Sequence, residues 1–313
     1  MEADIDIITI GEGLVELSSD ESLICAENFN KYYGGDTLSA GVTALRSGST
    51  VAYIAKVAND CFGEYLLDAW QLEGLDTSQV KLASGQNGIY FVGRGSNKVE
   101  MIFYRKKTAA TMLGIEDINF DFIKRSKMVY ATGFVQSLSI SCNEAVREVF
   151  SFAKENGIKV AYSPNFSNKV WSPEEAREAF YEISDYVDIL LLNLKDDATA
   201  IFEQDSPDKV FGITSDLAIE TTVIRENLMP TYTCTNGDIL EIPFEQEAAL
   251  IDSTGSDAVF NGAFLSYHLK GMNNLIAARY ANIVAGIQMQ NIGAIRSIPD
   301  KQTVEDIYRS LYG

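Results

Sequence analysis

The sequence is poor in the residues that build metal sites and disulfide frameworks. Its 313 residues include a single histidine, and its four cysteines are widely spaced, with no C-x-x-C pair among them. A structural zinc site needs clustered cysteine and histidine ligands, and a disulfide scaffold needs a denser set of cysteines. We therefore expect no protein-held metal and a reducing, cytoplasmic setting in which each cysteine is a small apolar side chain. The residues concerned are His268, Cys25, Cys61, Cys142 and Cys234.

Basic residues are also scarce. The chain has 25 Lys and Arg against 44 Asp and Glu, which gives a net charge of −19, and such a charge repels nucleic acid and anionic membrane surfaces. No apolar run approaches the ~20 residues that cross a bilayer. The acidic N-terminal stretch lacks the basic start of a signal peptide. The sequence thus predicts neither a nucleic-acid partner nor a membrane partner.

Linkers and repeats are absent as well. Only six prolines are present, and we find no internal repeat, low-complexity tract or Pro-rich linker. With 46% hydrophobic residues, a chain of this length can bury a large core. We expect residues 1–313 to form a single domain.

What the sequence does contain is an alternation of short apolar runs with longer amphipathic stretches. This is the βαβ rhythm of a parallel sheet covered by helices. Apolar residues repeat at helical spacing over 38–45 and 146–153. The strand-like runs lie near residues 6, 50, 128, 159, 188 and 221. The predicted fold class is α/β, with a mainly parallel sheet between layers of helices.

One segment breaks this rhythm. Residues 88–107 contain two alternating strands around a Gly-Ser-Asn turn, with no helix between them. Together with strand-like stretches at about 12–19 and 29–35, the hairpin is expected to form a small antiparallel sheet outside the main one. A flap of this kind commonly covers a pocket. The alternative is an edge hairpin with no role.

The stretch GGDTLSAGVTALRSGSTVAYIAKVANDCFGEYLL, residues 34–67, resembles the first signature of the ribokinase-like (PfkB) carbohydrate kinases. Among these, the 2-keto-3-deoxygluconate kinases are the nearest branch. Further segments with this resemblance are GIYF, FYRKKTAA, PNFSNKVW, LLNLKDD and ARYANIVAGIQMQNIGA. The resemblance implies a three-layer ribokinase-like domain with a β-sheet lid, often paired lid to lid in a homodimer. It also implies transfer of a phosphoryl group from Mg-ATP to a hydroxyl of a sugar or sugar acid.

The stretch DSTGSDAVFNGAFL, residues 252–265, falls on the catalytic motif of this family, D-T-x-G-A-G-D. There the last aspartate takes the hydroxyl proton and the Gly-Ala-Gly amides stabilise the moving phosphoryl group. With FNGAFL held in register, the base position falls on Ala258, and Asp257 occupies the last glycine of the amide cradle. A methyl group cannot accept a proton, and a carboxylate there opposes incoming phosphates unless Mg²⁺ or a basic side chain intervenes.

A second register keeps Asp257 as the base. This register holds DSTG fixed, deletes one loop residue and treats Val259 as an insertion in the helix. One inserted residue rotates the following part of the helix by about 100° relative to the part before it. We favour the first register because packing fixes the phase of a buried helix. The candidate catalytic residues are Gly255, Ser256 and Asp257, with Ala258 at the base position in the first register.

The nucleotide side departs from the family pattern too. Asn227 and Pro230 replace the glycines of Leu-Gly-x-x-Gly, so close backbone approach is lost there. Asn193 and Asp196 form Asn-x-x-Asp in place of Asn-x-x-Glu, which keeps the charge and shortens the reach. Asn282 remains in place. We expect weak nucleotide binding.

The sugar side is mixed. An arginine beside tyrosines suits a carboxylated, hydroxyl-rich ligand. The expected asparagine after GGDTL is Ser39, and Asp-Pro-Asn-x-Arg has become SPNFS, so Ser163 and Ser167 replace an acid and a guanidinium. By resemblance, the candidate substrate-binding residues are Gly34, Gly35, Ser39, Tyr90, Tyr104, Arg105, Asn165 and Ser167.

Three functions remain open at this stage. The first is a carbohydrate kinase homologue with a lidded sugar or sugar-acid pocket and reduced or lost phosphoryl transfer. The second is an active ATP-dependent sugar kinase with Asp257 as its base. The third is an interaction or regulatory protein that binds a partner through the lid.

Overall fold

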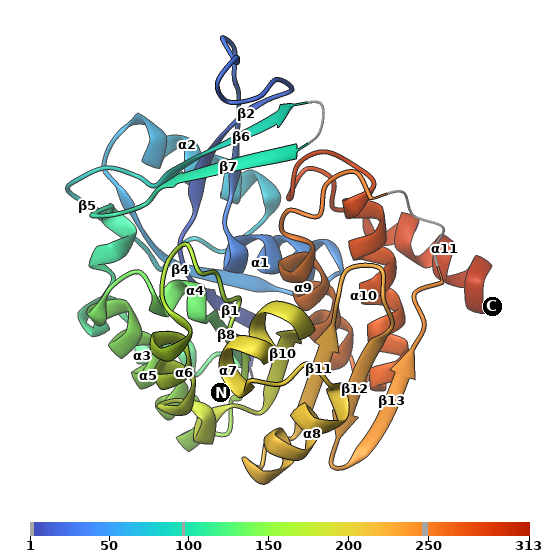
Figure 1. The fold of residues 1–313 in the computed structure, drawn as a ribbon. Coiled ribbons are helices and arrows are strands. Elements are labelled where there is room, and N and C mark those ends of the chain that lie inside the picture. Colours follow the sequence, from blue (N-terminus) through green and yellow to red (C-terminus); the bar gives the residue numbers. More distant parts are fainter. Residues whose placement is uncertain (1–2, 96–97, 246–249) are drawn as a thin grey trace.

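The computed structural model describes residues 3–95, 98–245 and 250–313. Its main element is a nine-stranded sheet of order β13-β12-β11-β10-β9-β8-β1-β4-β5 (Figure 1). The strands from β5 to β11 are parallel, and β12 and β13 add an antiparallel edge. The bounds are β1 Ile5–Ile10, β4 Val51–Ala58, β5 Val80–Ala83, β8 Ser126–Thr132, β9 Lys159–Ser163, β10 Ile189–Asn193, β11 Thr221–Arg225, β12 Thr231–Thr235 and β13 Asp238–Ile242.

The six strands predicted from the sequence are all confirmed, and they lie side by side from β11 to β4. Their side chains alternate between two buried faces, as parallel strands covered by helices must. Ile7 belongs to the hydrophobic cluster on one face of the sheet, and Ile8 to the cluster on the other. The fold class expected from the rhythm of the sequence is therefore the observed one.

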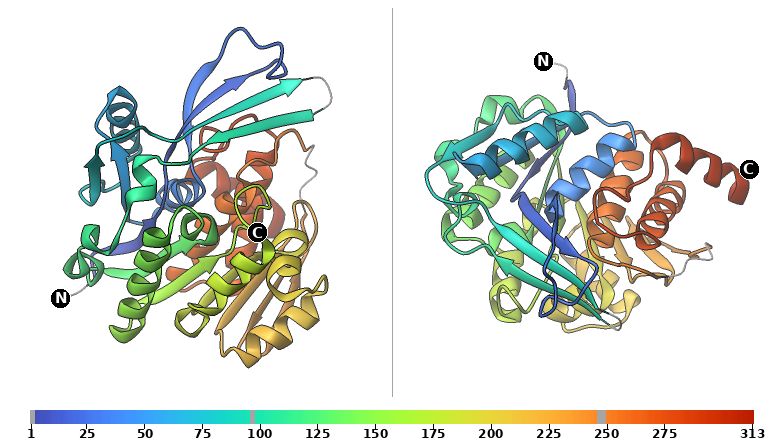
Figure 2. Two further views of the ribbon diagram at one scale, coloured as in Figure 1. Left: turned by 60° about the vertical axis from the view of Figure 1, so that its left-hand side comes forward. Right: turned by 90° about the horizontal axis from the view of Figure 1, so that it is seen from above.

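Helices cover both faces of this sheet (Figure 2). One cluster of core residues joins the sheet to α1 (Asp36–Arg46), α2 (Cys61–Glu73), α9 (Ser256–Leu269) and α10 (Asn274–Met289), with α11 (Lys301–Tyr312) packed on α10. The second cluster joins it to α3 (Phe120–Ile123), α5 (Ile140–Glu155), α6 (Pro173–Tyr181), α7 (Thr199–Phe202) and α8 (Pro207–Asp216). The helices predicted over 38–45 and 146–153 are α1 and α5. No helix in the described ranges is long and apolar enough to cross a membrane.

A second sheet of four strands stands apart from the main one (Figure 1). Its order is β3-β2-β6-β7, formed by β2 Leu14–Ser19, β3 Asn30–Gly34, β6 Ile89–Gly95 and β7 Lys98–Tyr104. The pairs β2·β3 and β6·β7 are antiparallel, and the central pair β2·β6 is parallel. The three segments expected to form a small sheet do so, although the turn residues 96–97 lie outside the described part of the chain. We call this element the small sheet.

The parallel strands bring several loops to one edge of the main sheet, because their carboxyl ends all lie at that edge. β8, β9, β10 and β11 end there at Thr132, Ser163, Asn193 and Arg225. The first turns of α1 and α9 also contribute to the cavity on this side, which the small sheet faces.

Candidate functional site

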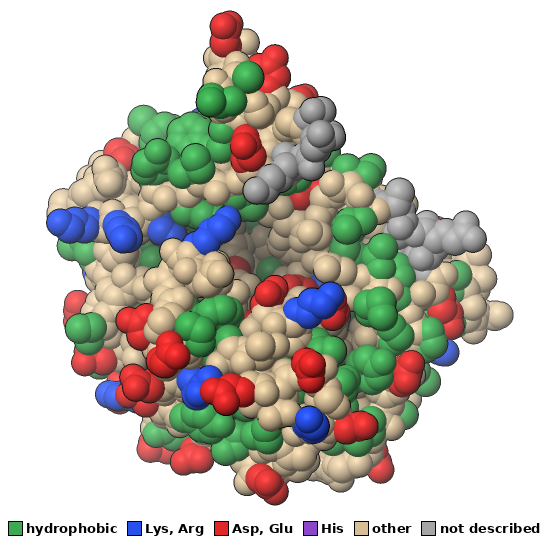
Figure 3. Space-filling model, in the orientation of Figure 1, with side chains coloured by type: hydrophobic (Ala, Val, Ile, Leu, Met, Phe, Trp, Pro, Cys, Tyr) green, Lys and Arg blue, Asp and Glu red, His purple; other side chains and the backbone are tan. Residues whose placement is uncertain are grey.

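A cavity of about 310 Å³ lies between the small sheet and this edge of the main sheet. Figure 3 shows this face hollowed directly below the small sheet. Most of the sequence candidates for substrate and catalytic roles line it. From that set the lining includes Gly35, Ser39, Tyr90, Asn165, Ser167, Gly255, Ser256, Asp257 and Ala258. We call it the sugar cavity.

Asp36 also lines this cavity and was not among the sequence candidates. It is the first residue of α1, and its carboxylate accepts hydrogen bonds from Asn165 Nδ2 at 3.0 Å and from the hydroxyl of Thr132. Asn165 has φ of +43°, a left-handed conformation that asparagine tolerates. Three segments are thus fixed around one carboxylate that can accept a ligand hydroxyl. The available signal was an acid directly after a double glycine, at a helix start.

The two glycines before Asp36 are required by close contacts. A Cβ on Gly35 would lie 2.3 Å from the carbonyl oxygen of Glu12, and Gly35 has φ of +146°. A Cβ on Gly34 would lie 2.2 Å from Tyr90 Oη. The double glycine therefore lets the backbone pass beneath Tyr90, whose hydroxyl donates to Glu16 in the small sheet.

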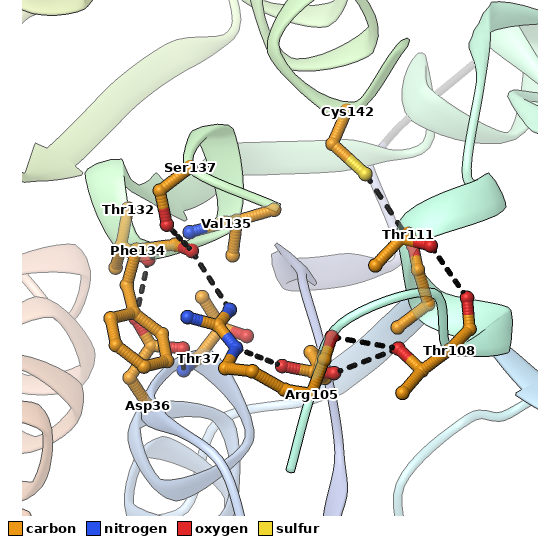
Figure 4. A network of polar contacts seen from close by, with 12 residues as sticks. Asp36, Thr37, Arg105, Thr108, Thr111, Thr132, Phe134, Val135, Ser137 and Cys142 are labelled. Carbon is orange, nitrogen blue, oxygen red and sulfur yellow. Dashed lines mark hydrogen bonds and ion pairs between the residues drawn. The ribbon is translucent and has the colours of Figure 1, made fainter. Parts of the chain in front are cut away.

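Arg105, predicted to meet a sugar acid, is buried and paired within the protein (Figure 4). Its Nε donates to Glu12 Oε2 at 2.9 Å, its Nη2 donates to the carbonyl of Phe134 at 3.1 Å, and its guanidinium lies 3.7 Å from the centre of the Phe134 ring. Burial raises the pKa of Glu12, although Arg105 acts in the opposite direction. The charge of Arg105 is therefore satisfied by a buried carboxylate, and this arginine supports the cavity wall.

A second cavity of about 510 Å³ adjoins the first and shares Met101, Phe103 and Lys169 with it. It runs along β7, one of the two edge strands of the small sheet, and is bounded on the other side by Ser137 and Leu138. Tyr104, a sequence candidate for substrate contact, lines this second cavity and is mostly exposed. We call it the β7 cavity.

Asp257 lies in the first turn of α9 and forms an ion pair with Arg225 at the carboxyl end of β11. Arg225 is almost completely buried, whereas the Asp257 side chain is 38% exposed. Asn193 Nδ2 lies 3.3 Å from the other carboxylate oxygen of Asp257. Burial lowers the pKa of Arg225, and Asp257 acts against that shift. The basic side chain that an acid in the amide cradle would require is therefore present on the neighbouring strand, and sequence reasoning did not identify it.

Ala258 follows Asp257 in an α-helix that runs without interruption from Ser256 to Leu269. It is 7% exposed and lines the sugar cavity, whereas Val259 and Phe260 are fully buried in the core. Gly255 precedes the helix with φ of +77°. The side chain that position 258 presents to the cavity is thus a methyl group, and the neighbouring carboxylate is held by Arg225.

The candidate nucleotide residues are occupied in local contacts. Asn193 Oδ1 accepts from the backbone N–H groups of Lys195 and Asp196, at 3.0 and 3.2 Å. Burial, and then the charge of Asp257, raises the pKa of Asp196. Asn282 Oδ1 accepts from Thr231 Oγ1 at 2.9 Å, and its buried Nδ2 has no partner in the described part of the structure.

As the sequence indicated, the turn after β11 carries side chains at the positions where the family has glycines. Asn227 has φ of +42°, so it keeps a left-handed conformation that glycine would adopt with less strain. Its carbonyl accepts from Arg225 Nη2 at 3.2 Å. Side chains at Asn227 and Pro230 occupy space that glycines would leave open to a ligand.

These residues are a poor fit to Mg-ATP. The N-terminus of α9, where free amides favour phosphate, carries the Asp257 carboxylate. We derive no reaction step through the nucleotide.

The small sheet is tied to the catalytic-motif stretch by an ion pair. Arg94 of β6 donates to Asp252 Oδ2 at 3.0 Å, with side chains that are 11% and 1% exposed. Burial acts to raise the pKa of Asp252, but hydrogen bonds from Thr254 and the contact with Arg94 outweigh it, so the pKa is lowered. Met101 of β7 also contacts Thr254. The small sheet is therefore in contact with the cavity floor on the α9 side.

Comparison with known proteins places these features in a family. The pattern of the pfkB family carbohydrate kinase matches residues 3–301. The 2-dehydro-3-deoxygluconokinase of Thermoproteus tenax is 26% identical and covers 99% of this chain and 96% of its own length. The protein with that description from Escherichia coli (strain K12) is 25% identical and covers 92% and 96%.

Solved structures agree on the fold. The 2-dehydro-3-deoxygluconokinase of Thermotoga maritima has a TM-score of 0.86 and 19% identity, covering 97% of this chain and 99% of that one. The fructokinase with bound ATP from Xylella fastidiosa has a TM-score of 0.86 and 18% identity, covering 98% and 99%. The ribokinase-like fold expected from the sequence resemblance is confirmed.

Proposed function

Because the chain belongs to the pfkB family of carbohydrate kinases, we propose that it binds a sugar or keto-deoxy sugar acid beneath the small sheet and has reduced or lost phosphoryl transfer. The observation that carries this proposal is the ion pair of Asp257 with buried Arg225, beside Ala258 in the cavity lining. The cavity keeps polar groups that suit hydroxyls, and it lacks a free carboxylate at the base position.

Asp36 and Asn165 are proposed to contact ligand hydroxyls, since an oriented carboxylate and amide recognise such groups. Ser39 and Ser167 add hydroxyls to the same lining, to which Gly35 contributes backbone. Tyr90, Met101 and Phe103 supply an apolar roof, with Tyr90 stacked on Phe103 at 5.5 Å between ring centres. The small sheet is then the lid of this site.

Weak phosphoryl transfer follows from the groups around Asp257. The Asp257 carboxylate is already engaged by Arg225 and by Asn193 Nδ2, so a ligand hydroxyl would have to displace one of these contacts to reach it. Ala258 provides no acceptor at all. Gly255 and Ser256 keep two amides of the cradle, but the Asp257 side chain stands where the family has a glycine that lets phosphate approach the backbone. We therefore propose that Mg-ATP, through Asn193, Asp196, Asn227 and Asn282, is bound weakly or not used.

One observation favours an active kinase as the second candidate. The Asp257 side chain is 38% exposed and lines the sugar cavity, so a ligand hydroxyl could reach it. In that case Asp257 is the base and Arg225 its positioning partner. Brisk turnover would require that a bound substrate separate the pair.

A sugar panel separates these functions. 2-Keto-3-deoxygluconate, gluconate and fructose are each added to the protein with Mg-ATP, and both ADP release and the shift in Tm are measured. A rise in Tm without ADP release supports the first proposal. Sugar-dependent ADP release that Asp257→Asn abolishes, in a chain that stays folded, assigns the base to Asp257.

Nucleotide binding is tested separately by isothermal titration with Mg-ATP. Weak binding is expected, since Asn227 and Pro230 stand where glycines allow close approach. Affinity in the low micromolar range, about −8 kcal/mol, would contradict it.

We also propose a homodimer that forms through the solvent face of the lid. Phe29, Phe91 and Tyr104 form an aromatic cluster there, with ring centres 5.5 and 5.8 Å apart, and Tyr104 is 62% exposed. Light scattering should give a mass of twice the 34.5 kDa of the chain. The double variant Phe29→Ser with Tyr104→Ser should give the mass of a single chain. If the protein binds none of these sugars and still pairs through this surface, an interaction role is favoured instead.

We also propose a cytoplasmic setting, which the four free thiols support.

A further inference from the structure

The β7 cavity differs in charge from the chain as a whole. The protein has a net charge of −19, yet no Asp or Glu lines this cavity, whereas Arg105, Lys106 and Lys169 do. In Figure 3, Lys and Arg side chains form a row on this face just below the small sheet, at the side of the hollow. A cationic cavity in an acidic protein attracts anions, because the local field is set by the nearest charges.

The three cations are not equivalent. Arg105 is paired with buried Glu12 and held by the Phe134 carbonyl, so its charge is satisfied inside the protein. Lys106 and Lys169 are exposed, and neither forms an ion pair with any residue of the described ranges. Two ammonium groups are therefore available to a ligand in this cavity.

Lys169 lies where the two cavities meet. It lines the β7 cavity and also the sugar cavity that contains Asp36 and Asn165. Its backbone is set by a turn in which Lys169 N donates to Ser167 Oγ at 3.4 Å and Val170 N donates to Ser167 O at 3.1 Å. Met101 and Phe103 also line both cavities, so the two cavities adjoin beneath β7. A ligand with hydroxyls at Asp36 would pass Lys169 to reach the β7 cavity.

From these positions we infer that the β7 cavity is a binding site for the anionic end of an extended, hydroxylated ligand, with Lys169 and Lys106 as its cationic contacts. The ligand class is a sugar acid or a sugar phosphate, since carboxylate and phosphate are recognised by the same ammonium groups. Gln86 and Ser137 line the same cavity and supply neutral polar groups. This inference rests on the proposed function for the sugar end of the ligand.

Paired ligands test the anionic site. Gluconate is compared with glucitol, and fructose 6-phosphate with fructose, by isothermal titration of the complete chain at two salt concentrations. The anionic member of at least one pair should bind at least about 5-fold more tightly at low salt, and the advantage should shrink at high salt. The pair that shows the larger advantage distinguishes a carboxylate from a phosphate.

Variants locate the effect. Lys169→Gln and Lys106→Gln should each reduce the ratio of anionic to neutral affinity by about 2-fold or more, and the neutral partner is titrated against each variant as the reference for that ratio. Lys107→Gln is the matched control, because Lys107 is exposed and adjacent in sequence but does not line the cavity. An equal loss in the Lys107 variant would show a general charge effect and overturn the site.

Inorganic phosphate tests the cavity independently of any sugar. Backbone amide NMR signals of Tyr104, Ser137 and Val170 should shift on titration with phosphate in the native chain and not in the Lys106→Gln, Lys169→Gln double variant. If neutral sugars bind while phosphate shifts none of these signals and anions gain no affinity, the inference fails and the proposed function stands. If phosphate shifts these signals while no sugar binds, the anion site stands and the proposed sugar function fails.

Discussion

Arg225 reaches from the carboxyl end of β11 to Asp257 in the first turn of α9, and the two side chains form an ion pair beside the sugar cavity. Arg225 is 3% exposed and also contacts the ring of Phe260, with 5.0 Å between guanidinium and ring centre. The pair explains how an acidic residue is tolerated at a helix start built from buried small residues. It also makes the charge of Asp257 structural, so that its removal affects stability as well as any catalysis.

The first prediction is that Asp257→Asn lowers the free energy of unfolding by about 2 kcal/mol. The cause is an unpaired guanidinium that stays buried, since loss of one partner from a buried pair costs more than the pair contributes. Urea unfolding at neutral pH measures it. Replacing both partners, Arg225→Met with Asp257→Asn, should recover most of the loss.

The matched control is Asp208→Asn. Asp208 is an exposed acid in the first turn of α8 and forms no ion pair in the described structure. The Asp208→Asn substitution should lower the free energy of unfolding only by the helix-dipole contribution, about 0.3–1 kcal/mol. Equal losses at both positions, or no recovery in the double variant, would show that Arg225 does not depend on Asp257.

The second prediction concerns Asp197, whose carboxylate joins two loops at the site. It accepts from Phe166 N at 2.7 Å and from Asn193 N at 2.8 Å. Burial raises its pKa to about 7, and the two N–H groups act in the opposite direction. Between about pH 4 and 7 the unfolded chain has released this proton and the folded chain has not. The folded state therefore binds more protons, and stability falls as pH rises through this window.

The Asp197→Asn variant cannot titrate at this position, so the comparison isolates the contribution of one carboxyl. From about pH 4.5 to 7, the native chain should lose stability relative to the variant by up to about 1.4 kcal/mol per pH unit. Above about pH 7.5 the difference should be constant. Urea unfolding of both chains across the range measures it, and a difference that does not depend on pH would contradict the raised pKa.

The third prediction is that Arg94 holds the small sheet closed. Arg94→Gln leaves the Asp252 carboxylate, 1% exposed, without its cationic partner, which should cost about 1–3 kcal/mol. Hydrogen exchange should increase in β6 and β7 more than in the main sheet, because the ion pair joins the two. Lys31→Gln provides the control, since Lys31 lies on β3 and contacts the ring of Tyr65 without an ion pair to the main body in the described ranges. Uniform exchange changes throughout the protein would contradict a local role.

The fold was predictable because its signal is local. Six central strands and the first long helices follow from apolar periodicity, which packing on two faces imposes on the sequence. The edge hairpin β12–β13 was missed, since four of the five residues of β13 are exposed and show no buried pattern. A usable signal was present in Asn236-Gly237, whose φ values of +50° and +90° match the tight turn that Asn-Gly favours.

The site was only partly predictable for a different physical reason. The lining residues near Gly35 and Asn165 could be read from motifs because each motif is continuous in sequence. Ion pairs depend on residues that the fold alone brings together: Glu12 and Arg105 are 93 positions apart, and Arg225 and Asp257 are 32 apart. A candidate cation in one motif therefore cannot be called available until its partner is known.

The last prediction is that a rewritten α9 start raises or creates sugar-kinase turnover. Changing Ser256→Ala, Asp257→Gly, Ala258→Asp and Val259→Ala converts GSDAVF to GAGDAF, which removes the charge from the amide cradle and places a carboxylate where Ala258 now lines the cavity.

The ion pair adds a requirement to this design. Without Asp257, buried Arg225 would be unpaired beside the new carboxylate, so Arg225→Thr belongs in the rewrite. Ser163→Asp and Ser167→Arg are included in a second version, because lost sugar contacts could mask a restored base.

A positioned general base raises the rate of the reaction by about 10²- to 10⁴-fold. ADP release with 2-keto-3-deoxygluconate and Mg-ATP should therefore rise by at least about 100-fold in one version. The control is the same rewrite carrying Ala258→Asn instead of Ala258→Asp, and equal rates in the two would show that the base position is not what limits this chain.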